Sequence, residues 1–110
     1  MPEREEYFAI ALNDFGDVIR VRLEKDRSAL VGFTIQYEAV FDGDLRPVVR
    51  YDTAHGFAHR DHLLWDGSTH HWDRMAERAT YRESLTEALS DIRNNWERYR
   101  SDFGRRRTVR

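Results

Sequence analysis

The 110-residue sequence contains no cysteine. This absence excludes disulfide bonds, thiolate ligands for a metal ion and cysteine nucleophiles. The sequence also lacks an apolar stretch long enough to cross a bilayer, and its first residues, MPEREEYFAI, lack the basic and apolar segments of a signal peptide. We therefore expect a cytoplasmic protein with no membrane partner.

An excess of charge of one sign is also absent. The chain has 18 Lys and Arg residues against 20 Asp and Glu residues, which gives a net charge of -2. This balance argues neither for nor against a nucleic-acid partner. Only the tail at residues 104–110 is strongly basic, and although arginine suits phosphate, a solvated terminus is the more ordinary interpretation.

Length and composition fit one domain, since hydrophobic residues make up 40% of the chain and no repeat or linker interrupts it. Residues 7–13 form a nearly continuous apolar run, which favours a strand. After the turn signal at 13–16, residues 18–24 alternate between apolar and charged side chains. A period of two places the apolar set on one face of a strand, so the two segments predict a hairpin.

The longest strand pattern covers residues 31–41, where large apolar side chains occupy every second position. Asp42-Gly43 then predicts a tight hairpin turn, because these residues tolerate positive φ angles. The next strand is expected at 48–52, with Pro47 at its start or at an edge. Since consecutive strands usually pair, residues 6–53 predict about four antiparallel strands in meander order.

A long helix is predicted at residues 80–103. Thr80 is followed three residues later by Glu83, which is a capping-box pattern. Spacings of three and four then place one apolar stripe on the helix, formed by Leu85, Ala88, Leu89, Ile92, Trp96, Tyr99 and Phe103. Gly104 is expected to end the helix. The stripe must pack on the sheet, so the fold class is α+β, with an antiparallel sheet and one long C-terminal helix on one face.

Residues 54–79 are expected to form an irregular connection, in which HLLWDG could add a short fifth strand. Long irregular connections in small domains are often functional. Trp65 and Trp72 lie in this segment and could cover the sheet or offer a surface on which a base stacks.

The candidate functional segment is RYDTAHGFAHRDHLLWDG, residues 50–67, which holds three histidines and three aspartates. Even spacing on a strand places His55, His59 and Asp61 on one face and His62 on the other. His55 and His59 would also share one face of a helix, although Gly56 argues against a helix here. In either case Asp52 can join the same polar cluster.

Two kinds of chemistry suit these residues. In the first, His55 and His59 act as general acid and base, Asp52 orients an imidazole, and Arg50 or Arg60 neutralises a phosphate.

This first set, with Tyr51 as a further substrate-binding residue, suits the cleavage of RNA. In the second, a divalent metal ion binds to His55, His59 and Asp61. The alternative to both is a structural turn, with histidines as hydrogen-bonding groups and Gly56 supplying a positive φ.

The segment PVVRYDTAHGFAHRDHLLWDG resembles a family of small uncharacterised bacterial proteins that share R-Y-D-x-A-H-G-x-x-H-R-D, and ALSDIRNNWERYR is similar to their C-terminal ends. The same stretch also resembles TumE-like toxins of toxin–antitoxin pairs. The matching positions are Tyr51, Asp52, His55, Gly56, His59 and Arg60. This resemblance implies action on RNA and a nucleotidyltransferase-like antitoxin as partner.

Two functional hypotheses follow. The first is a toxin-like or defence-associated protein that acts on RNA or another phosphate substrate through the His/Asp cluster. The second is a non-enzymatic domain that binds a protein partner or a second copy of itself, through its polar sheet face or an exposed strand edge. A homodimer is the simplest form of the second hypothesis.

Overall fold

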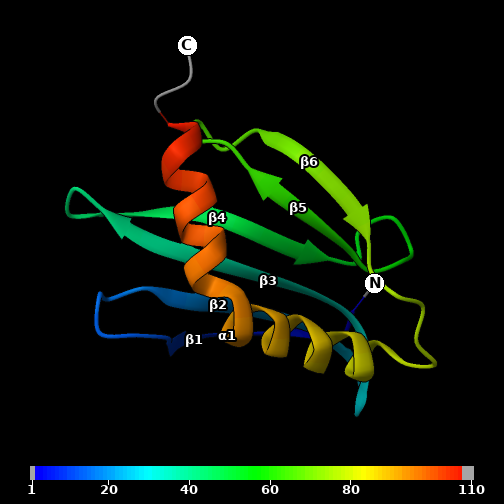
Figure 1. Cartoon of the computed structure of the whole chain (residues 1–110). Coiled ribbons are helices and arrows are strands. Elements are labelled where there is room, and N and C mark those ends of the chain that lie inside the picture. The colour runs from blue at the N-terminus through cyan, green and yellow to red at the C-terminus, as the bar shows by residue number, and fades with distance from the viewer. Residues whose placement is uncertain (1, 108–110) are drawn as a thin grey trace.

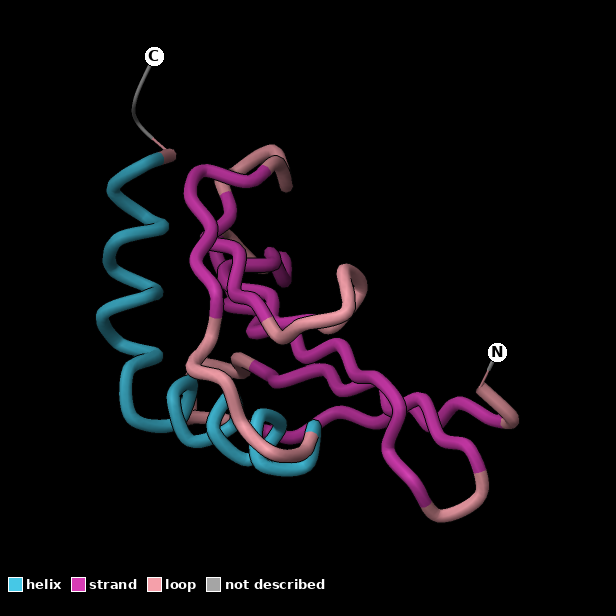
Figure 2. The backbone as a smooth tube through the Cα atoms, turned by 90° about the vertical axis from the view of Figure 1, so that its right-hand side faces the viewer, coloured by secondary structure: helices cyan, strands magenta, loops and turns pink. Residues whose placement is uncertain are grey.

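The computed structural model describes residues 2–107 and shows an antiparallel sheet with one long helix on one face (Figures 1 and 2). The six strands are β1 (Arg4–Ala11), β2 (Val18–Asp26), β3 (Ala29–Phe41), β4 (Asp44–Asp52), β5 (His59–Leu63) and β6 (Thr69–Arg74), and the helix is α1 (Tyr81–Arg106). The strands lie in sequence order, β1-β2-β3-β4-β5-β6. The predicted α+β class and the helix on an antiparallel sheet are confirmed, but the sheet has six strands rather than about four.

The two additional strands occupy the connection that was expected to be irregular. β5 pairs with β4, and β6 pairs with β5, so both belong to the one sheet. Their sequences, HRDHL and THHWDR, consist largely of charged and histidine side chains. No apolar alternation marks such strands, because they are held by backbone pairing with the neighbouring strand rather than by burial of an apolar face.

The β3–β4 hairpin turns at Asp42 (φ 54°) and Gly43 (φ 85°), as predicted. However, β4 begins at Asp44 and not near Val48, so Pro47 lies inside the strand. The register with β3 shifts between Tyr37 and Glu38, opposite Pro47. On the edge that faces away from β3, β4 pairs with β5 only from Val49 onward. Pro47 therefore lies where this edge of β4 is not paired with β5, and its missing N–H costs no hydrogen bond there.

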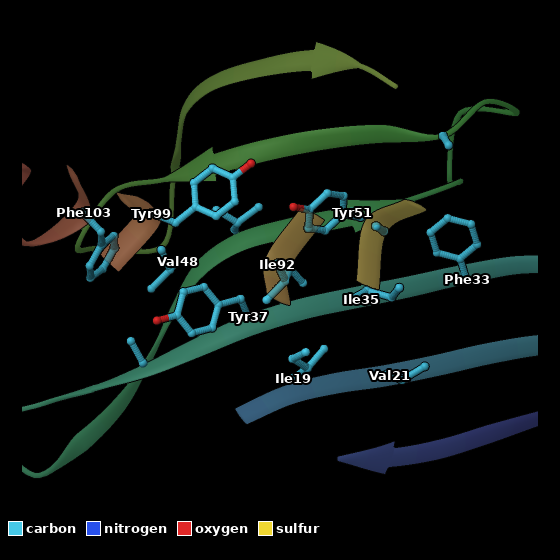
Figure 3. Packing of buried hydrophobic residues seen from close by; sticks show 14 residues of the cluster. Ile19, Val21, Phe33, Ile35, Tyr37, Val48, Tyr51, Ile92, Tyr99 and Phe103 are labelled. Carbon is cyan, nitrogen blue, oxygen red and sulfur yellow. The ribbon is translucent and has the colours of Figure 1, made fainter. Parts of the chain in front are cut away.

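The core lies between the sheet and α1 (Figure 3). The buried side chains that form it include Ile19 and Val21 from β2, Phe33, Ile35 and Tyr37 from β3, Val49 and Tyr51 from β4, and Ala88, Ile92, Tyr99 and Phe103 from α1. The predicted apolar stripe of the helix therefore packs on the sheet. Burial of one large side chain such as Ile92 contributes about 1.5–3 kcal/mol.

Thr80 caps the start of α1 as predicted, but the Glu83 side chain contacts the Thr80 hydroxyl rather than its backbone N–H. The Thr80 hydroxyl oxygen accepts a hydrogen bond from the Glu83 backbone N–H at 3.3 Å, and the hydroxyl donates to Glu83 Oε1 at 3.2 Å. No helix in residues 2–107 is long and apolar enough to cross a membrane.

The predicted end of the helix at Gly104 is wrong, because α1 continues to Arg106. A Cβ atom at Gly104 would lie 3.4 Å from Phe41 Cε1, which is ordinary van der Waals contact, so the helix can continue through this position. The first residues of the expected basic tail are therefore helical, and residues 108–110 lie outside the described residues.

Candidate functional site

The register of β4 and β5 sorts the candidate residues onto two faces of the sheet. Arg50 pairs with Asp61 and Asp52 pairs with His59, whereas Tyr51 pairs with Arg60. Paired residues of antiparallel strands share a face and successive residues alternate. Since Tyr51 packs in the core beneath α1, the other pairs point away from the helix, onto what we call the outer face.

Three side chains on the outer face converge and form what we call the outer-face triad: Asp52, His59 and Asp61. His59 Nε2 lies 3.3 Å from Asp52 Oδ1 and 3.4 Å from Asp61 Oδ2. The side chains are 7% exposed for His59 and 16% exposed for each aspartate. The structure thus brings together His59 and Asp61, which even spacing placed on one face, with Asp52, which was expected to join their cluster.

The hydrogen-bonding capacity of the triad is only partly satisfied. Asp52 Oδ1 also accepts from the Ala54 backbone N–H at 3.0 Å. Among the described residues, His59 Nδ1 is buried without a hydrogen-bond partner. In the same part of the chain, the ion pairs recorded for Asp52 and Asp61 involve His59 alone. The triad therefore combines two carboxylates with one imidazole and no arginine or lysine partner.

His55 lies beside the triad on the loop between β4 and β5. Its side chain is exposed, and its ring centroid lies 5.3 Å from that of His59. The loop turns at Gly56, whose φ is +83° and whose N–H donates to the Thr53 carbonyl at 3.1 Å. The glycine at this turn thus brings an exposed histidine next to a buried one.

An open groove of about 600 Å³ gives access to the triad from solvent. Its lining residues are His55, Phe57, His59, Asp61, Thr69 and Trp72. Trp72 is 55% exposed and its ring lies edge-on to His59, with centroids 6.1 Å apart. The Arg74 guanidinium lies 4.2 Å from the centroid of the Phe57 ring. The groove thus offers aromatic surface beside the triad, and Arg74 lies next to Phe57 at its margin.

The two tryptophans of this region differ in burial. Trp65 stacks on Phe103, with ring centroids 5.3 Å apart, and packs against the core. Trp72 is exposed on the outer face. Phe57 and Arg74 were not predicted as site residues, although each lies two positions from a selected residue, Phe57 from His59 and Arg74 from Trp72, and this even spacing could have identified them.

Arg50 also points to the outer face. Its Nε donates to Gln36 Oε1 at 2.8 Å, and Gln36 Nε2 donates to Glu38 Oε2 at 2.6 Å. Arg50 is also the register partner of Asp61. This arginine therefore belongs to a polar row that crosses the outer face next to the triad.

Arg60 lies on the opposite face, under α1. Its Nε donates to Asp73 Oδ1 at 3.0 Å, and its Nη1 donates to Asp91 Oδ2 at 3.0 Å and to the Tyr99 hydroxyl at 2.8 Å. Burial opposes the guanidinium charge, but Asp73, Tyr99 and Asp91 together outweigh burial and raise the pKa of Arg60. The structure therefore does not bring Arg60 together with His55 and His59.

Tyr51 belongs to the same network on the helix side. The Tyr51 hydroxyl donates to Asp91 Oδ2, which also accepts from the Tyr99 hydroxyl at 2.6 Å. Burial, followed by the hydrogen bond to Asp91, raises the pKa of Tyr51. Burial alone would raise the pKa of Asp91, yet its three donors lower it. These contacts fasten α1 to β4 and β5 and leave Tyr51 outside the groove.

A second cluster of donor atoms, His62, His71 and Asp73, lies on the helix side of β5 and β6. The rings of His62 and His71 stack with centroids 5.2 Å apart. Burial and the nearby charge of Arg60 lower the pKa of His62. Because both oxygens of Asp73 already accept from Arg60, the carboxylate charge in this cluster is neutralised within the protein.

Comparison with known proteins identifies the family of the chain but no activity. A family model described as a domain of unknown function, DUF7718, matches residues 1–109, and the chain therefore belongs to this family. No curated protein and no solved structure matches the sequence at a significant level.

Proposed function

We propose that this DUF7718 domain cleaves single-stranded RNA in the outer-face groove. The observation that carries the proposal is the position of the outer-face triad, which holds a buried imidazole between two carboxylates. The triad lies at a groove that the exposed side chains of His55 and Trp72 also line. Ionisable groups that converge in a cleft beside apolar surface are typical of active sites.

The reaction uses the two histidines as proton carriers. His55, which is exposed, takes the proton of a ribose 2'-hydroxyl, and the 2'-oxygen attacks the adjacent phosphorus. The bond from phosphorus to the 5'-oxygen breaks, and His59 protonates that leaving oxygen. Asp52 fixes the orientation of the His59 ring. The products are a 2',3'-cyclic phosphate and a free 5'-hydroxyl.

The walls of the groove favour a single strand over a duplex as substrate. Trp72 and Phe57 offer ring faces on which unpaired bases can stack, a contact worth about 1–3 kcal/mol per base. Arg50 and Arg74 supply cations for the phosphates on the same side of the sheet. A toxin-like or defence-associated role, with an antitoxin that covers the groove, accords with the resemblance to TumE-like toxins.

The test is a cleavage assay with a fluorescently labelled single-stranded RNA and the matching RNA in which every 2'-hydroxyl is methylated. We expect the unmodified RNA alone to be cut, because methylation removes the nucleophile. His55→Ala should lower the rate at least about 100-fold, in line with general acid–base catalysis. Its melting temperature should stay close to that of the wild type, since the side chain is exposed.

His71→Ala is the matched control. His71 is also an exposed histidine, but it lies on the helix side of β6. Cleavage that His71→Ala retains and His55→Ala loses supports the proposal. Equal rates for all three proteins, or cleavage of the methylated RNA, would contradict it.

A second candidate function is self-association through β1, which forms one edge of the sheet. Tyr7 and Phe8 on this strand are 68% and 48% exposed, and α1 packs chiefly on β3 and β4. An exposed edge strand with large apolar side chains can pair with a second copy. We expect light scattering to show a dimer that Phe8→Asp converts to a monomer, and a monomeric wild type would rule this candidate out.

A further inference from the structure

We infer that the outer-face triad binds one divalent transition-metal ion, with His59 Nε2, Asp52 Oδ1 and Asp61 Oδ2 as ligands. This inference rests on the proposed function for the RNA substrate and the groove, but it changes the role of His59, because an Nε2 that binds an ion cannot also protonate the leaving oxygen. Its own evidence is the geometry and charge of the triad.

The spacing of the three ligand atoms suits such an ion. Zinc binds imidazole nitrogen and carboxylate oxygen at about 2.0–2.2 Å, so two ligands in a tetrahedral arrangement lie about 3.4 Å apart. The two distances from His59 Nε2 to the aspartate oxygens are 3.3 and 3.4 Å. All three ligand atoms lie within 4.8 Å of one another. Little movement is therefore needed to form the site.

The charge of the triad also calls for a cation. Two carboxylates, each only 16% exposed, share a single imidazole, and no lysine or arginine ion pair is recorded for either of them among residues 2–107. Like charges held close together at a half-buried position repel each other strongly. A divalent ion would neutralise both carboxylates.

The two nitrogens of the His59 ring have different surroundings. This residue is 6% exposed, and its Nδ1 has no hydrogen-bond partner within the described part of the chain. Because Nδ1 and Nε2 lie on different sides of the ring, the ion would bind Nε2, and Nδ1 would need a separate partner such as an ordered water. The open groove on the solvent side gives such an ion a path of entry.

The donor set indicates the class of ion. One imidazole with two carboxylates is suited to Zn²⁺, Mn²⁺ or Fe²⁺, whereas Mg²⁺ and Ca²⁺ prefer oxygen ligands alone. His55, whose ring centroid is 5.3 Å from that of His59, can supply a further ligand or leave that position to water. The chemistry that such an ion supplies is polarisation of a phosphoryl oxygen.

The second donor cluster, His62, His71 and Asp73, provides an internal comparison. Its ligand atoms also lie within 4.8 Å of one another, but Arg60 already neutralises its carboxylate. A cation placed there would approach the guanidinium of Arg60. We therefore assign the ion to the outer face alone.

The experiment is a calorimetric titration of the chelator-treated, full-length protein with Zn²⁺. We expect one ion per chain. Asp61→Asn keeps the shape of the side chain but removes its charge, and it should weaken binding by more than about tenfold. His71→Ala should bind as the wild type does, because it alters only the other cluster.

The inference is overturned if the wild type binds no Zn²⁺, or if His71→Ala loses the ion and Asp61→Asn keeps it. The RNA assay separates this result from the proposed function. Cleavage by protein that binds no metal supports the proposed function and refutes the metal site, with His59 acting as the acid. Binding of one ion without any cleavage supports the metal site and refutes RNA as substrate.

Discussion

Replacement of Asp91 by Ala should be among the most damaging single changes in the chain. One oxygen of Asp91 accepts hydrogen bonds from Tyr51, Tyr99 and Arg60, which come from β4, α1 and β5. Both tyrosines are buried, at 1% and 3% exposure, so their hydroxyls would lose their acceptor at a largely buried position. The change removes the contacts that hold α1 on this part of the sheet.

The size of the effect can be estimated from these contacts. A buried hydroxyl left without a partner costs about 1–3 kcal/mol, and loss of a half-buried ion pair adds to that. Arg60 keeps Asp73 as a partner, so the total should be about 3–5 kcal/mol rather than the sum of the upper limits. For 110 residues, about 4 °C of melting temperature corresponds to each kcal/mol. We therefore expect the melting temperature to fall by about 12–20 °C.

The assay is thermal unfolding followed by circular dichroism at pH 7. Glu87→Ala is the control, because Glu87 lies on the same helix and pairs with Arg78 at an exposed position. That variant should lose less than about 1 kcal/mol. On the same scale of about 4 °C per kcal/mol, a melting temperature of Asp91→Ala within about 3 °C of the wild type corresponds to a loss below about 1 kcal/mol. That result would refute the structural role assigned to this network.

Three further predictions concern stability. Because burial and Arg60 lower the pKa of His62, the unfolded chain binds its proton more readily, and stability is lost as pH falls below about 6.5. Between about pH 7.5 and about pH 5.5, roughly one unit either side of the usual histidine pKa, His62→Gln should therefore lose less stability than the wild type in urea unfolding. Equal losses for the two proteins would contradict the lowered pKa of His62. Thr80→Ala should lower the free energy of unfolding by about 1 kcal/mol through loss of the helix cap, whereas Thr80→Ser should stay close to the wild type. Gly56→Ala should lose about 1 kcal/mol in the same assay, because its φ of +83° strains any residue with a Cβ, and an unchanged midpoint would show that the loop adapts.

The sequence by itself determined the elements whose pattern is local. A period of two over β2 and β3 sorts apolar from charged side chains, so the core face of the sheet follows from spacing alone. The cap at Thr80 and the turn at Asp42-Gly43 depend on residues within three positions of each other. The same alternation predicted that His59 and Asp61 share a face.

Only the tertiary structure decided which candidates act together. Arg60 and Tyr51 lie next to Asp52 and His59 in sequence, but strand alternation turns them toward α1, where Asp91 binds them from 31 and 40 residues away. No local pattern contains that distance. The partner is chosen by how the helix packs across the sheet.

The strands β5 and β6 were likewise decided by the tertiary structure. Their polar side chains give no apolar period, and they become strands because β4 offers backbone donors and acceptors that a lone segment lacks. Asp17 shows the same dependence, since its buried carboxylate accepts from Tyr37 at 2.6 Å and from the Val40 N–H at 2.9 Å across the sheet. Local spacing thus fixed which side chains share a face, and packing between distant segments fixed which of them became a site and which became structure.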